Sequence, residues 1–293
     1  MVVINKRYDA LTPDELNTLF KKGEFHLLLW SDPYIFMDVY GLTDPITFNI
    51  PLLIYNNETI PLYFKVKGSS SVADYNFPET QLGSVGANSK ALLNYTFTRT
   101  HPGTLPSPIT ETINITVEAY EDDAYTQLYG SETLQFTVEL FDRTQGTVID
   151  IDGFEADLDG WVGNKTTLKR TTEKAFEGAY SMTFDRDSTP PDYYVTPEKY
   201  DNRYAYKSLD TTPYTSVYMV AHALGNHSII YRRRTVIYGG DYVLRFVLPS
   251  ANVWYRLCYK LPIDASATVK IWLYKWYGGG AYIYYDYVIF VGW

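Results

Sequence analysis

The sequence is short of cysteine and of positive charge, and it contains no long apolar run. Its 293 residues include one cysteine, Cys258, which excludes an internal disulfide and leaves packing as the source of stability. Lys and Arg number 25 against 34 Asp and Glu, a net charge of −9, so we expect no nucleic-acid partner. No segment approaches the roughly 18 apolar residues of a membrane span, and the N-terminus lacks the apolar core of a secretory signal. We therefore expect no membrane insertion and synthesis without a signal peptide.

Catalytic signatures are also scarce. The four histidines are scattered, and none has a partner at the spacing of a metal site or of a nucleophile motif. The triple glycine at 278–280 precedes no helix pattern, so it does not form a phosphate cradle. The acidic pair Asp122 and Asp123 would serve glycoside hydrolysis only if the fold placed another carboxylate opposite it. We therefore predict that the protein is not an enzyme.

Tyrosine and alternating strand patterns are abundant. The chain has 29 Tyr against 14 Phe, and tyrosine suits half-buried strand positions because its ring is apolar and its tip is polar. Residues 25–148 contain about seven alternating segments separated by Pro, Gly and Asn breaks, which is the spacing of an immunoglobulin-like sandwich. Together with the aromatic strands of the C-terminal half, this predicts an all-β fold of two β-sandwich domains.

One short helix is predicted near the N-terminus. Thr12 is a good N-cap, Pro13 suits the first helical position, and Glu15 completes a capping box with Thr12. A helix this short is not stable alone, so we expect its apolar face to pack on the sandwich or on another subunit. The predicted domains are an N-terminal docking segment (1–24), an immunoglobulin-like sandwich (25–146) and a second sandwich (147–293).

The second domain begins and ends with matching signatures. Residues 152–155 (Asp-Gly-Phe-Glu) with Trp161 open it, and residues 285–288 (Tyr-Asp-Tyr-Val) close it. Between them the small-residue turn at 177–179 leads into an alternating strand. This order resembles the jelly-roll carbohydrate-binding modules over about half of the chain. The resemblance implies a jelly-roll domain that binds a ligand and does not catalyse a reaction.

The resemblance also implies a structural calcium ion that ties the first strand to the last. The implied oxygen ligands are Glu155, Asp286, Asp152, Asp157 and the backbone near Glu177. Calcium takes about six to eight oxygens, a number that these residues reach with added water. The closing strand departs from the family pattern, because Tyr287 stands where the family often has a second acid. The alternative is that these acids only end strands or face solvent.

Aromatic residues near the C-terminus form a candidate sugar platform. Alternation over residues 269–276 directs large rings to one face, and pyranose CH groups pack well on such rings. The basic run at 232–234 would hold an acidic group of the glycan through bidentate contacts. The predicted sugar-binding residues are Trp272, Tyr274, Trp276, Tyr282, Tyr284 and Arg233. Two alternatives stay open for the rings, a subunit interface and core packing, and the basic run also suits an edge strand or intersubunit salt bridges.

The whole chain is similar in organisation to virion surface, tail or spike proteins of phages and archaeal viruses. This resemblance implies a non-enzymatic structural component of a virus particle, at the virion surface or extracellular, whose jelly roll attaches to a host-surface glycan. Its expected partners are other virion proteins and copies of itself in a homo-oligomer. The alternative is a secreted or cell-surface carbohydrate-binding accessory protein or adhesin. The alternative predicts a monomer that binds glycan in isolation, whereas the virion role predicts self-assembly.

Overall fold

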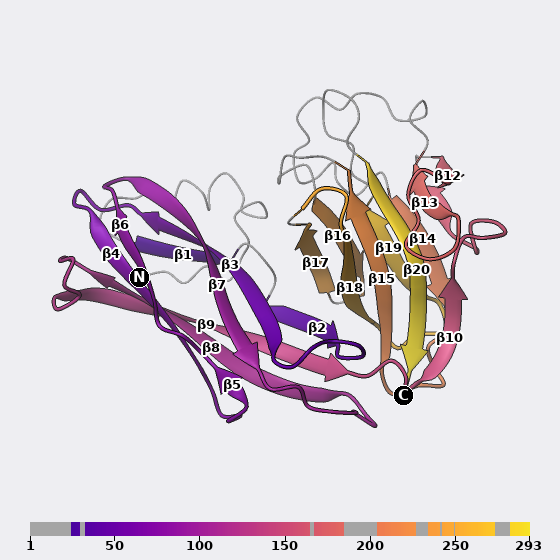
Figure 1. Cartoon of the computed structure of the whole chain (residues 1–293), viewed down its shortest axis with the longest axis horizontal. Helices are drawn as coiled ribbons and strands as arrows, with labels where there is room; N and C mark the ends of the chain where they lie inside the picture. The colour runs from indigo at the N-terminus through magenta and orange to yellow at the C-terminus, as the bar shows by residue number, and fades with distance from the viewer. Residues whose placement is uncertain are drawn as a thin grey trace. The chain divides into compact units, whose positions relative to one another are not determined.

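The structure is a computed structural model, and its described part consists of strands and loops (Figure 1). It describes residues 25–29, 33–164, 167–184, 204–226, 234–240, 242–248, 250–272 and 282–293. No helix occurs among these residues, and the strands form several antiparallel sheets. The predicted all-β fold of sandwich domains is therefore confirmed. The helix predicted from Thr12 onward lies outside the described residues.

The chain divides into two compact units, and each has its own sheets. The first unit comprises Met1–Ile35 and Gly41–Leu140, and the second comprises Phe36–Tyr40 and Phe141–Trp293. The short segment Phe36–Tyr40 thus belongs to the second unit although it is remote from it in sequence. No local pattern in the sequence indicates this membership.

Two sheets are built by the strands that precede Asp142. One has the order β1-β3-β7-β5 and the other the order β2-β9-β8-β4-β6. The bounds of the first sheet are β1 Phe25–Leu29, β3 Ile46–Asn56, β5 Tyr75–Asn76 and β7 Ser89–Arg99. Those of the second are β2 Tyr34–Asp38, β4 Leu62–Ser70, β6 Thr80–Val85, β8 Ile109–Tyr120 and β9 Leu128–Phe141. On β8 the alternating residues Ile113, Ile115 and Val117 are completely buried, as strand periodicity requires of a core face.

A buried ion pair links these two sheets inside the first unit. The Arg99 guanidinium on β7 donates two hydrogen bonds to the Glu111 carboxylate on β8, Nε to Oε2 at 2.9 Å and Nη2 to Oε1 at 2.6 Å. The Tyr75 hydroxyl donates a third hydrogen bond to Glu111 Oε2 at 2.6 Å. Burial and the Glu111 carboxylate raise the pKa of Tyr75 well above its ordinary value, so its hydroxyl stays a donor. The positive charge of Arg99 and the negative charge of Glu111 therefore balance each other within the core.

The second unit pairs a six-stranded sheet with a five-stranded sheet. The six-stranded sheet has the order β12-β13-β20-β15-β18, with β10 also paired to β20, and the other has the order β11-β14-β19-β16-β17. The bounds of the former are β10 Thr147–Asp152, β12 Leu168–Thr171, β13 Ser181–Phe184, β15 Val217–Gly225, β18 Trp254–Leu261 and β20 Ile283–Gly292. Those of the latter are β11 Val162–Asn164, β14 Tyr204–Leu209, β16 Arg234–Gly239, β17 Tyr242–Val247 and β19 Ala267–Trp272.

The first strand of the second unit's continuous segment lies beside its last strand. β10 pairs with β20 in an antiparallel register that sets Asp152 opposite Val288 (Figure 1). β20 also pairs with β15, so β20 occupies the middle of the sheet. The nine residues of β15 are all buried. The opening and closing sequence signatures therefore meet at one end of this sheet.

The segment Phe36–Tyr40 is held on the second unit by backbone contacts. The Asp38 N–H donates to the Cys258 thiol sulfur at 3.4 Å, and Arg256 Nη1 donates to the carbonyl oxygens of Asp38 and Tyr40 at 3.1 and 2.6 Å. Burial raises the pKa of Cys258 to about 12, so the thiol is neutral. The single cysteine is therefore a packing residue.

Candidate functional site

The outer face of the five-stranded sheet of the second unit carries two tyrosines on one strand. On β14, Ala205 and Lys207 are buried, whereas the alternating residues Tyr204 and Tyr206 are half-buried. Side chains alternate along a strand, so the two tyrosines share the outer face. Their ring centroids lie 5.9 Å apart with an interplanar angle of 66°. The rings together offer an apolar surface with polar tips.

Polar side chains border this tyrosine pair on both neighbouring strands. On β11, Asn164 stands opposite Tyr204 in the register, and the 49% exposed Val162 stands opposite Tyr206. On β19, Lys270 stands opposite Tyr206, and its Nζ lies 5.1 Å from the centroid of the Tyr204 ring. We call the residues of this surface the tyrosine face: Val162, Asn164, Tyr204, Tyr206, Ser208, Thr268 and Lys270.

Two hydroxyls lie at the end of the tyrosine face where β14 ends and β19 begins. Ser208 Oγ and Thr268 Oγ1 are hydrogen-bonded at 2.8 Å across the register of β14 and β19. Behind them the odd-numbered residues Val269 and Ile271 are completely buried, so β19 has one core side and one outer side. The face therefore combines aromatic rings, an amide, hydroxyls and one ammonium group on a rigid sheet.

The residues predicted to bind sugar lie in different places. Trp272 ends β19, where the backbone register sets it opposite Tyr204 and Val236. Tyr282 and Tyr284 are 5% and 2% exposed, and the Tyr284 hydroxyl donates to Glu173 Oε2 at 2.8 Å. These two rings are part of the core and have no surface for a ligand. Tyr274, Trp276 and Arg233 lie outside the described residues.

Tyr204 and Tyr206 were missed at the sequence level because their strand has an unusual pattern. The sequence Tyr-Ala-Tyr-Lys-Ser-Leu alternates, but its inward positions are Ala205 and Lys207. A lysine at an inward position breaks the apolar rule by which strands are recognised. The repeated spacing of the two tyrosines was the available signal.

Two carboxylates from opposite ends of the second unit's continuous segment hold the same turn, residues 176–180. Glu155 follows β10, Asp286 lies within β20, and both accept hydrogen bonds from backbone N–H groups of the turn. The distances are 2.9 Å from Ala179 and 3.0 Å from Tyr180 to Glu155 Oε1, and 2.7 Å from Phe176 and 3.0 Å from Glu177 to Asp286 Oδ2. The predicted pair thus meets at the turn that the sequence signature marks.

Glu155 and Asp286 bring two carboxyl groups to one turn, and neither has a basic partner in the part of the chain that the structure describes. Asp286 is completely buried, and its burial, with a smaller contribution from the Glu155 carboxylate, raises its pKa. In the described ranges no salt bridge involves either carboxylate. No group of three or more His, Cys, Asp or Glu side chains suited to a metal ion occurs among the residues described. A calcium ion here would therefore take two carboxylates and complete its shell with backbone carbonyls and water.

Asp152, a third predicted ligand, is committed to protein contacts. Its Oδ2 accepts a hydrogen bond from Trp161 Nε1 at 2.9 Å, and its Oδ1 pairs with Lys207 Nζ. Lys207 also lies 2.7 Å from Asp150 Oδ2. Burial raises the pKa of Asp152 to about 6 in spite of Lys207, and the Asp150 and Asp152 carboxylates outweigh burial and raise the pKa of Lys207. The cluster joins β10 to β14, and each oxygen of Asp152 is already in contact with a donor from the protein.

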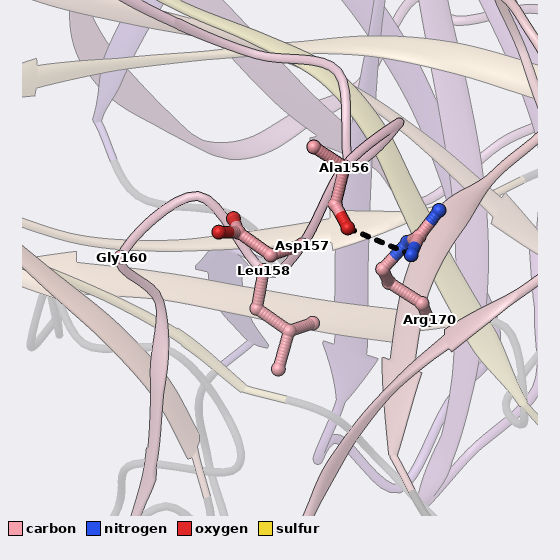
Figure 2. A pocket seen from close by; sticks show the side chains of 5 residues that line it. All are labelled: Ala156, Asp157, Leu158, Gly160 and Arg170. Atoms are coloured by element: carbon pink, nitrogen blue, oxygen red, sulfur yellow. Dashed lines mark hydrogen bonds between the residues drawn. The ribbon is translucent and has the colours of Figure 1, made fainter.

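Asp157 and Glu177, the remaining predicted ligands, are exposed. Asp157 Oδ1 accepts a hydrogen bond from the Asp159 N–H at 2.6 Å and borders a shallow depression of about 540 Å³. Figure 2 shows its lining residues, Ala156, Asp157, Leu158, Gly160 and Arg170. The backbone of Glu177 does meet Asp286, through its N–H, whereas the hydrogen bond of the Asp157 carboxylate is to Asp159.

Arg170 fixes the wall of this depression. Its guanidinium donates to three successive backbone carbonyls, those of Phe154, Glu155 and Ala156, at 2.7, 2.6 and 2.8 Å, the last of which is drawn in Figure 2. The guanidinium carbon also lies 3.8 Å from the centroid of the Tyr180 ring. All its strong donors therefore serve the loop, and the depression is a product of loop anchoring.

His222 is buried in the six-stranded sheet, and it is a packing residue. Its ring stacks on Phe176 at 3.9 Å and 7°, and its Nδ1 lies 3.3 Å from the Tyr287 carbonyl oxygen. Burial lowers its pKa to about 4, so the ring is neutral near pH 7. In the described structure its partners are the Tyr287 carbonyl and the rings of Phe176 and Tyr287. We find no basis for catalysis in this ring.

Comparison with known proteins gives distant structural likenesses. The chain is similar to the C-terminal family 22 carbohydrate binding module of Clostridium thermocellum Xyn10B, with 14% identity and a TM-score of 0.34, over 50% of this chain and 92% of that one. It is also similar to the tandem CBM22-1-CBM22-2 domain of Paenibacillus barcinonensis Xyn10C, with 9% identity and a TM-score of 0.35, over 93% of this chain and 98% of that one.

A third similar structure is the secreted serine protease VesC of Vibrio cholerae, with 8% identity and a TM-score of 0.28. That likeness covers 89% of this chain and 50% of the protease. No protein-family model matches the chain, and no curated protein matches it. Within the described residues, no helix has the length and apolar character needed to cross a membrane.

Proposed function

We propose that this protein binds carbohydrate without catalysing a reaction, and that the tyrosine face of its second unit holds the glycan. The observation that carries the proposal is the pair Tyr204 and Tyr206, two half-buried rings on the outer side of one strand. Polar side chains stand beside them in register on both neighbouring strands. This is the composition that a sugar site needs.

The chemistry of a pyranose fits the tyrosine face. Its CH groups pack on an aromatic ring, and its hydroxyls need donors and acceptors at fixed positions around that ring. The Asn164 amide offers both kinds of group, the hydroxyls of Ser208 and Thr268 offer both, and the Lys270 ammonium donates. All of them stand on paired strands, which fix the position of each group before a ligand arrives.

Binding to a glycan panel by isothermal titration tests this proposal. We expect Tyr206→Ala to weaken binding about tenfold, because stacking on an aromatic ring contributes on the order of 1 kcal/mol. Tyr129→Ala is the matched control, since Tyr129 is a 37% exposed tyrosine on β9, remote in sequence from the tyrosine face. Equal weakening by both variants, or binding of no glycan by the native chain, would contradict the proposal.

For the biological setting we propose a structural component of a virus particle, at the virion surface or extracellular. What supports this is the order of predicted segments in the sequence, a docking segment, an immunoglobulin-like sandwich and a jelly roll. In this setting the chain assembles with itself and with other virion proteins and presents the tyrosine face to a host-surface glycan. The alternative setting is a secreted or cell-surface carbohydrate-binding accessory protein or adhesin. Light scattering on the purified chain distinguishes them, because the first predicts an oligomer and the second a monomer.

We also propose that calcium is a structural ion between Glu155 and Asp286. What supports this is the uncompensated charge of the two carboxylates, one of them completely buried. A bound calcium ion supplies the missing positive charge. Chelation with EDTA is expected to lower the melting temperature, and added calcium is expected to restore it. A Glu155→Gln variant should lose this response, and an unchanged melting temperature of the native chain would contradict calcium binding.

A further inference from the structure

Lys270 holds a central position on the tyrosine face. It lies on β19, the middle strand of the sheet, with Tyr206 and Tyr238 as its register partners on the two sides. Its neighbours Val269 and Ile271 are completely buried, so its half-buried side chain rises on the outer face. Its ammonium is placed at the ring of Tyr204, 5.1 Å from the centroid.

The charge around Lys270 is unusual for this protein. The whole chain carries a net charge of −9, yet the seven residues of the tyrosine face include one ammonium and no carboxylate. Lys207, the lysine of the neighbouring strand β14, faces inward, where Asp150 and Asp152 bind it. Among the seven residues of the tyrosine face, Lys270 carries the charged group that lies nearest the Tyr204 ring, where a ligand packed on that ring would meet it.

We propose that the tyrosine face selects acidic glycans, and that Lys270 binds the carboxylate or sulfate group of the sugar. This inference rests on the proposed function, since it names the class of glycan that the same face takes. The rings of Tyr204 and Tyr206 would pack on the sugar ring, and the ammonium beside them would meet the acidic substituent. An ammonium held against an aromatic face has less freedom to lose when it binds an anion.

The test compares glycans that share a backbone and differ in charge. Polygalacturonate and its methyl-esterified form probe the carboxylate, and carrageenan and its chemically desulfated form probe the sulfate. For the native chain we expect about tenfold tighter binding to the acidic member of at least one pair, with the preference declining as salt is added. The pair that shows the preference identifies the acidic group.

Two variants assign the preference to Lys270. Lys270→Gln should bind the acidic and the neutral partner about equally, whereas Lys270→Arg should retain the preference for the acidic one. Lys260→Gln is the matched control, because Lys260 also lies near a tyrosine ring, at 5.6 Å from Tyr218, but on β18 of the other sheet. The control should bind like the native chain.

The outcomes separate this inference from the proposed function. Equal binding of acidic and neutral glycans, with loss in Tyr206→Ala, overturns the role of Lys270 and leaves the carbohydrate site in place. A preference that persists in Lys270→Gln also overturns it. Absence of binding to every glycan of the panel overturns both.

Discussion

Lys207 on β14 forms an ion pair with Asp152 at the end of β10 and so joins the two sheets of the second unit. Asp152 is completely buried and Lys207 is 8% exposed, so water does not screen the pair. The Trp161 indole completes the contacts of Asp152 at 2.9 Å. Two residues, Trp161 and Lys207, therefore depend on one carboxylate.

Removal of this carboxylate should destabilise the protein. Asp152→Asn is expected to lower the free energy of unfolding by about 2–4 kcal/mol, because a buried charge that loses its partner is costly. The loss stays below the upper end of that class of effect because Lys207 retains Asp150. Urea unfolding measures the change. Asp150→Asn, at a more exposed carboxylate, should cost under about 1 kcal/mol, and an equal loss in both variants would contradict the role assigned to Asp152.

His222 should make stability depend on pH. Its pKa is about 4 in the folded protein, below the ordinary value of 6.5, because burial disfavours the charged ring. The unfolded chain therefore binds more protons between pH 4 and 6.5, and the stability contributed by neutral His222 rises with pH through this window and is lost as pH falls. We expect about 2 kcal/mol more dependence in the native chain than in His222→Phe over this range. Urea unfolding at pH 4.5 and 7 in both proteins gives the difference, and parallel curves would contradict the assignment.

Gly178 should not tolerate a side chain. Its φ is +67°, and a Cβ there would lie 2.3 Å from Glu155 Oε1. Gly178→Ala should therefore lower stability by about 2–4 kcal/mol, through backbone strain and displacement of Glu155 from the turn. Gly103→Ala is the control, because Gly103 has a φ of +75° but open space around it. It reports the strain alone, about 1 kcal/mol, and thermal unfolding that gives equal losses would show that the Glu155 contact contributes nothing.

Arg170 should control the order of the loop that follows β10. Its guanidinium donates to the carbonyls of Phe154, Glu155 and Ala156, and a lysine has no planar fork to replace it. Arg170→Lys is expected to increase amide hydrogen exchange in residues 153–160 about tenfold. Lys169→Arg, a change of similar size at the neighbouring exposed position, should leave the exchange unchanged. Native-like protection in Arg170→Lys would show that other contacts order the loop.

Part of the fold followed from the sequence because it depends on local periodicity. Ile113, Ile115 and Val117 alternate with polar residues, and the structure buries all three on one side of β8. The opening and closing signatures of the second unit likewise predicted that its ends meet, and β10 pairs with β20. On β8 a pattern within a few residues fixes which side of the strand avoids water, whereas the meeting of the two ends was implied by the resemblance to jelly-roll modules.

The sequence predicted the candidate sugar site less completely than the fold, because the exposure of an aromatic ring depends on which segments cover its strand. Tyr282 and Tyr284 have the composition of a platform, but both are buried, and Tyr284 donates to Glu173 from a loop over a hundred residues away in sequence. Tyr204 and Tyr206 have the same composition and remain on the outer face. Nothing within either short segment distinguishes the two pairs.

The sequence by itself determined the all-β class and the alternation that defines each core face, since both depend on local pattern. The resemblance to jelly-roll modules, and not the local pattern, implied that Glu155 and Asp286 lie at the same turn. Tertiary structure alone decided which aromatic rings face solvent and that Lys207 points inward to Asp152. A buried lysine is stable only where carboxylates from other strands surround it, and that arrangement exists only once the sheets have packed.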